Sequence, residues 1–326
     1  MQDLFTDADR QKINAAMASG SGSRFTELSA ATPNPSGTMT WVTRLIGIVV
    51  GIVVGLIFVA VLGLAGLIGL VVLVVVAIFV ASRVAGWLHR RKLQAQAERE
   101  IVGGWAAQRG WTFVERIPVM QTTPLLRQGD RRETGWGVTG QLEGGVAFAA
   151  GQYEYEVDRQ VSSTDSDGNT TTRTETDYHP FTVALLAAPL PDLNQIAIQA
   201  GKTGGILSKL SGLVTSLRPV ELESAEFNGA FRLMVADDAD ELAIRMRFTP
   251  AVQVALIERG PGASQIEGEN DVLLVAREGK TDTDDFGELL DVLGDAIWFR
   301  ALLTDVPAGR VPDTATLRRL LLGADA

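Results

Sequence analysis

The sequence predicts an α+β protein in which a transmembrane helical hairpin precedes a cytoplasmic region of antiparallel hairpins and packed helices. Residues 45–82 form a run of 38 residues without a charged side chain. Beyond residue 110, segments rich in β-branched and aromatic residues alternate with turn-forming pairs, which is typical of antiparallel strands. Near the C-terminus, apolar residues recur at helical spacing.

The charge-free run is nearly twice the length of one membrane span, because a helix crosses the ~30 Å hydrocarbon core with about 20 residues. Two spans at about 42–62 and 66–86 fit this length, and one long or kinked span is the alternative. In the hairpin, the aromatic and basic residues that flank the run reach one membrane interface. These interface residues are Trp41, Arg44, Arg83, Trp87, Arg90, Arg91 and Lys92.

Small residues recur at every fourth position in both spans. They are Gly47, Gly51 and Gly55 in the first, and Ala77, Ala81 and Ala85 in the second. Small side chains let helix backbones approach closely in lipid. These two rows of small residues are therefore predicted to lie where the two helices of the hairpin contact each other, or where chains contact each other in a homo-oligomer. Because the run holds no ionisable residue, a transport path is disfavoured.

Positive charge near a span favours its cytoplasmic end. We therefore expect an integral protein of the inner (cytoplasmic) membrane, with both termini and the main domain cytoplasmic and the lipid bilayer as a partner. The chain has no cysteine, so disulfides and thiolate metal sites are excluded.

The C-terminal part is acidic. Residues 93–326 hold 35 of the 39 acidic residues and 21 of the 29 basic ones, a net charge of −14. Such a domain is repelled by phosphate backbones, so nucleic acid is not an expected partner.

The chain is expected to divide into five parts. They are an N-terminal arm and flexible linker (1–40), the hairpin (41–87), a membrane-exit helix (88–110), a β-rich subdomain (111–218) and an α+β subdomain (219–326). In the N-terminal arm, Thr6 and Asp9 predict the cap of a short helix. The weak apolar face of that helix predicts a loosely docked or disordered segment.

The β-rich subdomain should contain strands at 111–114, 138–142, 146–161 and 170–186. The pair Asp167–Gly168 predicts a hairpin turn between the last two. Since residues 162–176 are almost wholly polar, the tip of this hairpin should project into water.

In the last third, Asn228–Gly229 predicts a type I′ turn between strands 220–227 and 230–236. Helices are expected at 238–247 and, with Thr249 as cap and Pro250 in the first turn, up to residue 258. Another hairpin (265–267 and 272–276), an amphipathic helix (284–303) and a final helix (313–322) complete the prediction.

Three segments resemble a known family: residues 223–231, the pair Asp237–Asp238 and the pair Thr249–Pro250. They are similar to an uncharacterised family of bacterial membrane proteins, a domain of unknown function. The resemblance implies paired apolar spans before an α+β cytoplasmic region, and it carries over no catalytic or binding residue.

Candidate chemistry is sparse. Asp165, Asp167 and Asn169 resemble part of a calcium loop, but Gly168 directly follows Asp167 and Thr174 stands where the loop needs Glu, so a solvated turn explains the same residues. Gly201–Lys202–Thr203 lacks the first glycine of a phosphate-binding loop. Two distant histidines do not make a zinc site. We therefore expect no catalytic residue, no cofactor and no metal.

These observations favour a membrane-anchored interaction or scaffolding domain without catalytic activity, which binds a protein partner or forms a homo-oligomer. The alternative is an enzyme or ligand-sensing domain whose site is assembled from residues dispersed in the sequence.

Overall fold

The computed structural model describes residues 5–6, 8–15, 79–80, 83–90, 92–93, 96–97, 99–118, 122–164, 170–190, 195–200, 217–260, 264–269, 271–279, 286–304 and 311–322. The chain forms two compact units, one of residues 1–15 with 103–326 and one of residues 16–102. In the second unit, the described residues begin at Phe79 and are helical.

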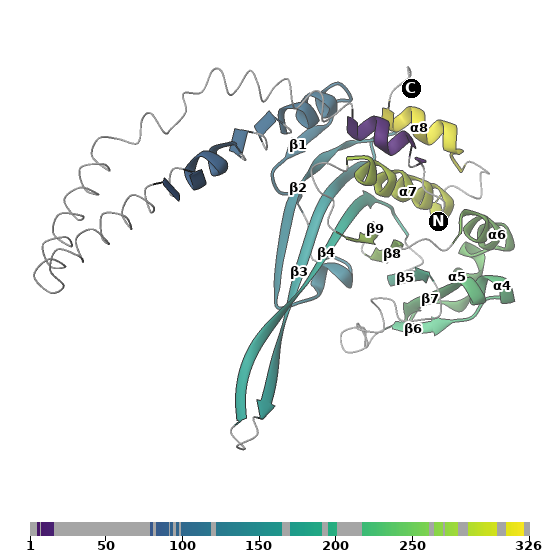
Figure 1. The fold of residues 1–326 in the computed structure, drawn as a ribbon. Coiled ribbons are helices and arrows are strands. Elements are labelled where there is room, and N and C mark those ends of the chain that lie inside the picture. Colours follow the sequence, from purple (N-terminus) through teal and green to yellow (C-terminus); the bar gives the residue numbers. More distant parts are fainter. Residues whose placement is uncertain are drawn as a thin grey trace, which may run out of the picture. The chain divides into compact units, whose positions relative to one another are not determined.

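Within the described residues, the first unit is built on one antiparallel sheet of nine strands, in the order β1-β2-β3-β4-β9-β8-β5-β7-β6 (Figure 1). The strands are β1 (Thr112–Val114), β2 (Arg131–Gln141), β3 (Ala147–Thr164), β4 (Thr170–Ala187), β5 (Gln195–Ala200), β6 (Leu217–Val220), β7 (Phe231–Ala236), β8 (Ser264–Glu269) and β9 (Val272–Glu278). The predicted pairing of 146–161 with 170–186, and of 265–267 with 272–276, is confirmed.

One face of the sheet carries a hydrophobic core under the short 3₁₀ helix η1 (Leu125–Arg127). Alternate residues of β3 and β4 supply it because successive side chains of a strand point to opposite faces. Its members include Tyr153, Tyr155, Phe181 and Val183.

Helix α7 (Phe286–Thr304) packs on β3, β4 and β9. The sequence predicts an amphipathic helix here, but most of α7 is buried. The N-terminal helix (residues 8–15) and α8 (Thr314–Leu322) supply the additional cover. The N–H of Gly287 donates to Asn14 of the N-terminal helix, and α8 also packs on α7.

Helices α4 (Ala225–Ala230), α5 (Glu241–Arg247) and α6 (Pro250–Arg259) lie between β6 and β8 in the sequence. The predicted start of α6 is confirmed, since the Thr249 hydroxyl accepts from the N–H of Val252 and Pro250 is the first helical residue. Asp240 caps α5, so this helix begins at Glu241, three residues after the predicted start at 238.

The predicted type I′ turn at Asn228–Gly229 is wrong. Both residues belong to α4, whose cap is Ser224. Strand β7 pairs instead with β6, so that Val220 lies opposite Leu233. The Asn228 amide accepts from the N–H of Leu222 (3.0 Å) and donates to the Leu222 carbonyl (2.7 Å), and these bonds hold the connection in place of a turn.

The predicted fold class is corrected in one respect. Within the described part of the chain, no helix is both long and apolar enough to cross a membrane. The longest described helix, α7, contains buried carboxylates that are paired with arginines, so its apolar side chains serve a protein core. The observed class is α+β without a transmembrane helical hairpin among these residues. The first predicted span, 42–62, lies outside the described residues, as does most of the second.

The N-terminal arm is also more ordered than expected. The predicted cap is confirmed, because Thr6 and Asp9 hydrogen-bond to each other through side chain and backbone. Phe5 is buried, and Arg10 forms an ion pair with Asp291 of α7. The two regions predicted as subdomains share the nine-stranded sheet, and strand β6 runs across residue 218, where a boundary was expected.

Candidate functional site

The most prominent feature of the first unit is a two-stranded extension of the sheet (Figure 1). Strands β3 and β4 have 18 residues each, whereas strands usually have about 5–6. Strand β2 pairs with β3 only as far as Glu156, and β9 pairs with β4 only from Phe181 onward. We call the remaining part, residues 158–164 with 170–178, the β3–β4 arm.

The outer edge of β4 is an open pairing edge. Successive residues of an antiparallel strand direct their backbone groups to alternate sides. The Pro180 carbonyl accepts from the N–H of Gly279, which continues β9, so the even-numbered residues of β4 direct their backbone groups away from β3. Among the strands that the structure describes, none pairs with residues 170–178 on this side. The edge therefore offers N–H and C=O groups to another strand.

Polar cross-strand contacts hold the β3–β4 arm together. The hydroxyls of Ser162 and Thr172 lie 3.0 Å apart. The Thr176 hydroxyl donates to Asp158 at 2.7 Å. An ion pair joins Arg159 to Asp177 at 2.7 Å. The arm is thus a defined ribbon without an apolar core of its own.

Aromatic rings fix the base of the arm to the core. Tyr155 stacks on His179 with ring centroids 4.7 Å apart and on Phe181 at 5.8 Å. Burial raises the pKa of Tyr155 to about 12, so its hydroxyl stays protonated at neutral pH. His179 packs on the Tyr155 ring at the base of the arm.

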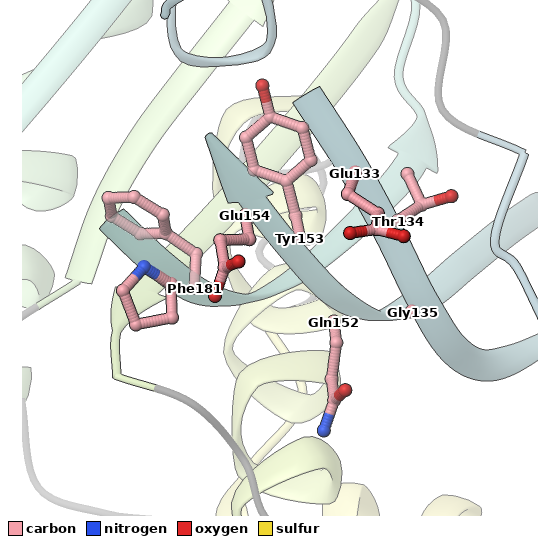
Figure 2. A pocket seen from close by; sticks show the side chains of 8 residues that line it. Glu133, Thr134, Gly135, Gln152, Tyr153, Glu154 and Phe181 are labelled. Atoms are coloured by element: carbon pink, nitrogen blue, oxygen red, sulfur yellow. The ribbon is translucent and has the colours of Figure 1, made fainter. Parts of the chain in front are cut away.

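A shallow pocket of about 130 Å³ also lies near the base of the arm (Figure 2). It is formed where the register of β2 against β3 shifts between Thr134 and Gly137, a bulge. Gly137 faces Gly151 there, and an added side-chain carbon on Gly137 would come within 2.1 Å of the Ala150 carbonyl. Only glycine fits so close an approach of two backbones.

The chemistry of this pocket is limited. Glu133 lies directly opposite Glu154 in the ladder, and Figure 2 shows Gln152 and Tyr153 directed to opposite sides of β3. Glu133 is paired with Arg116 at 3.9 Å. No group of three metal-binding side chains occurs in the part of the chain that the structure describes. The volume is also below the roughly 300–1,000 Å³ of typical ligand sites.

A larger groove of about 350 Å³ lies where α7, α8 and the β2–β3 turn meet. Arg109 donates to the Leu321 carbonyl (2.9 Å) and lies over the Trp105 ring. Burial lowers the pKa of Arg109. Arg300 donates to the Ala187 carbonyl at 2.8 Å. The lining residues are Arg109, Trp111, Gln141, Leu142, Glu143, Val146, Ile297, Arg300, Ala301, Pro312 and Leu320.

A fully buried carboxyl group, Glu267 of β8, lies beneath η1. It accepts from the N–H of Leu125 (2.9 Å) and from the Gln265 amide. Burial raises the pKa of Glu267, although these hydrogen bonds oppose the rise. Next to it, Arg127 and Glu269 form two parallel hydrogen bonds of 2.7 Å. Both carboxyl groups hold η1 on the sheet.

A second buried network joins four elements. Asp291 and Asp295 of α7 are almost fully buried. Arg259 of α6 contacts Asp295 at 2.5 Å, and Arg277 of β9 contacts it at 3.4 Å. Arg10 of the N-terminal helix pairs with Asp291. These ion pairs join α7 to the N-terminal helix, α6 and β9.

The residues singled out from the sequence fall mostly outside the described part. The calcium candidates Asp165, Asp167 and Asn169 do so, as do Gly47, Gly51, Gly55, Ala77, Ala81, Trp41, Arg44 and Arg91. Ala85, Arg83, Trp87, Arg90 and Lys92 lie on described helical residues of the second unit, and Trp87 is 53% exposed there.

Sequence reasoning recognised the polar hairpin but missed its open edge. The alternating sequence Thr-Arg-Thr-Glu-Thr from 172 to 176 was a signal, because a strand that is polar on both faces does not belong inside a sheet. Comparison with known proteins finds no matching family model, curated protein or solved structure. The resemblance to a bacterial membrane-protein family therefore stays a prediction.

Proposed function

We propose that the first unit is a protein-interaction module and that the β3–β4 arm is its contact surface. The open edge of β4 carries this proposal. A two-stranded ribbon is only marginally stable by itself, and this arm adds little buried apolar surface to the fold. An unpaired edge is also a template for pairing with another chain. Binding by strand addition uses such an edge, with backbone hydrogen bonds for affinity and side chains for specificity.

Shortening the arm separates this role from a structural one. Val157 pairs with Asp177, and the odd-numbered residues of β4 direct their backbone groups toward β3, so this pair is hydrogen-bonded. Residues 158–176 can therefore be replaced by Asn-Gly, which closes a two-residue hairpin on this pair. We expect the shortened protein to unfold at nearly the same denaturant concentration as the parent, because the removed residues lie outside the core. We expect its assembly with partners to be lost.

Contacts of the arm can be trapped by a photo-crosslinking amino acid at Thr172 in the full chain. Leu242 of α5, which is 64% exposed, is the matched control position. Crosslinks from 172 but not from 242 support the proposal. Equal labelling from both positions, or unfolding of the shortened protein, would contradict it.

The groove beside α7 supports a second candidate function, ligand sensing. Its volume falls within the range of small-molecule sites, and its lining combines apolar side chains with two guanidinium groups. A ligand with an apolar body and a carboxylate fits this lining.

Octanoate should raise the unfolding temperature of the parent but not of an Ala301→Trp variant, which fills the groove. No shift in the parent would exclude this ligand class.

A further inference from the structure

The partner of the β3–β4 arm can be inferred from the charges along its open edge, an inference that rests on the proposed function. We propose that the edge of β4 pairs with the same edge of a second copy of this chain, antiparallel and centred on Thr174. The two copies would then be related by a two-fold axis through this residue, and their sheets would join.

Backbone geometry restricts the register. The even-numbered residues 170–178 direct their N–H and C=O groups outward, as the bond from Gly279 to the Pro180 carbonyl shows. In an antiparallel pair centred on Thr174, residue 172 faces 176 of the second copy and residue 170 faces 178. At each of these even-numbered positions, the outward N–H and C=O groups of one copy therefore face those of the other copy.

The charges select this centre among its neighbours. With Thr174 on the axis, Arg173 lies opposite Glu175 of the second copy, and Glu175 lies opposite Arg173 of the second copy. A centre on 173 would place two arginines face to face, a centre on 175 two glutamates, and a centre on 176 would oppose Glu175 to Asp177. A centre on 172 gains no charge pair. Opposite charges across strands stabilise a sheet, whereas like charges destabilise it.

The side chains at the edge are available for these contacts. Residues 170–174 and Tyr178 are exposed, and Tyr178 retains 62% of its accessible surface. Arg173 already contacts Glu175 of its own strand at 2.6 Å. A guanidinium has five donors, so it can contact Glu175 of both copies. On the face of the strand that carries the even-numbered residues, Thr172 would lie opposite Thr176 of the second copy, and the two Thr174 residues would lie opposite each other. Threonine opposite threonine is a favourable cross-strand pair.

The chain has no cysteine, so single introduced cysteines report directly on the register. Residues on the axis would have Cα atoms about 5.5 Å apart, within the roughly 4.4–6.8 Å range of disulfides. We expect the full chain with Thr174→Cys to form a disulfide-linked dimer under mild oxidation. Thr171→Cys is the matched control, because its two copies would lie roughly 20 Å apart.

A mixture of Thr172→Cys and Thr176→Cys should form a mixed dimer, and each alone should not.

Charge variants test the same register without a covalent bond. Arg173→Glu alone and Glu175→Arg alone each place like charges across the interface, so each should raise the dimer dissociation constant by about tenfold or more. Mixed together, the two variants place opposite charges across it and should dimerise, although each chain still has like charges within its own strand. Analytical ultracentrifugation measures both results.

The outcomes separate this inference from the proposed function. A parent that stays monomeric, with no disulfide at 174, overturns the pairing of two copies. If the photo-crosslinker at 172 then captures a different protein, the arm is still a contact surface. If it captures nothing, both proposals fail. A disulfide that forms from Thr172→Cys alone overturns the centre at 174.

Discussion

The most informative single residues in this fold are buried acids. Asp291 and Asp295 are held by arginines from three different elements, and Glu267 is held by a backbone N–H and an amide. Burial of a charge without a partner is strongly unfavourable. Each acid therefore requires its partners to be in place, which ties distant segments to one arrangement.

Glu267 predicts a specific pH dependence. Because burial raises its pKa, the folded state holds the proton more tightly than the unfolded chain. The stabilisation is complete below the ordinary glutamate pKa of about 4.3 and is lost as the pH rises through the folded pKa. Glu267→Gln cannot ionise, so its free energy of unfolding should increase relative to the parent across this interval.

Urea unfolding at a series of pH values measures this difference. Glu241→Gln is the control, because Glu241 is exposed and its bond with Arg245 lowers its pKa, the opposite direction. A difference between Glu267→Gln and the parent that does not change with pH would show that Glu267 does not titrate in this way.

At the scale of elements, the region around Asn228–Gly229 shows how local chemistry can support two structures. Asn-Gly is favoured in type I′ turns, but Ser224 also caps a helix, and its hydroxyl accepts from the N–H of Phe227 at 3.1 Å. Asn228 then binds Leu222 through both amide atoms. The helix, with its cap and these two bonds, is the observed structure.

Gly229→Ala distinguishes the two structures. Gly229 is helical and has open space where a side chain would lie, so alanine should stabilise the protein by up to about 1 kcal/mol. A type I′ turn requires positive φ there, and alanine would destabilise it. Gly260→Ala is the matched control: Gly260 has φ of 83°, so this variant should lose stability. Thermal and urea unfolding measure both changes.

At the scale of the whole molecule, the first unit is assembled from two segments that are separated in sequence by residues 16–102. The N-terminal segment contributes Phe5, which is buried, and Arg10, which binds Asp291. Asp9 pairs with Arg318 of α8 at 2.5 Å. The segment therefore contacts both α7 and α8.

Deletion of residues 2–15 from the full chain should cost about 3–5 kcal/mol of unfolding free energy, because it removes a partner of a buried carboxylate. A synthetic peptide of residues 1–15 should restore the denaturation midpoint in a concentration-dependent way. The same peptide with Arg10→Ala is the control and should restore much less. An unchanged midpoint after the deletion would mean that the segment contributes nothing to stability.

Several elements could be predicted because their signals lie within a few residues of one another. Thr6 with Asp9, and Thr249 with Pro250, identify helix starts from side chains that bind the adjoining backbone. The alternation along β3 and β4 identifies the long hairpin. The candidate site was predicted in part: its polar character follows from residues 170–176, but its open edge depends on where β2 and β9 end.

The sequence by itself determined the α+β class, the helix caps, the long polar hairpin and the acidic balance, because each depends on neighbours along the chain. Only the tertiary structure decided the order of the nine strands, the pairing of β4 with β9, the helix at Asn228–Gly229 and the burial of Asp291 against Arg10. These features depend on packing between segments far apart in sequence. Local propensity does not indicate which distant residue pairs with a buried charge or which distant strand pairs with a free edge.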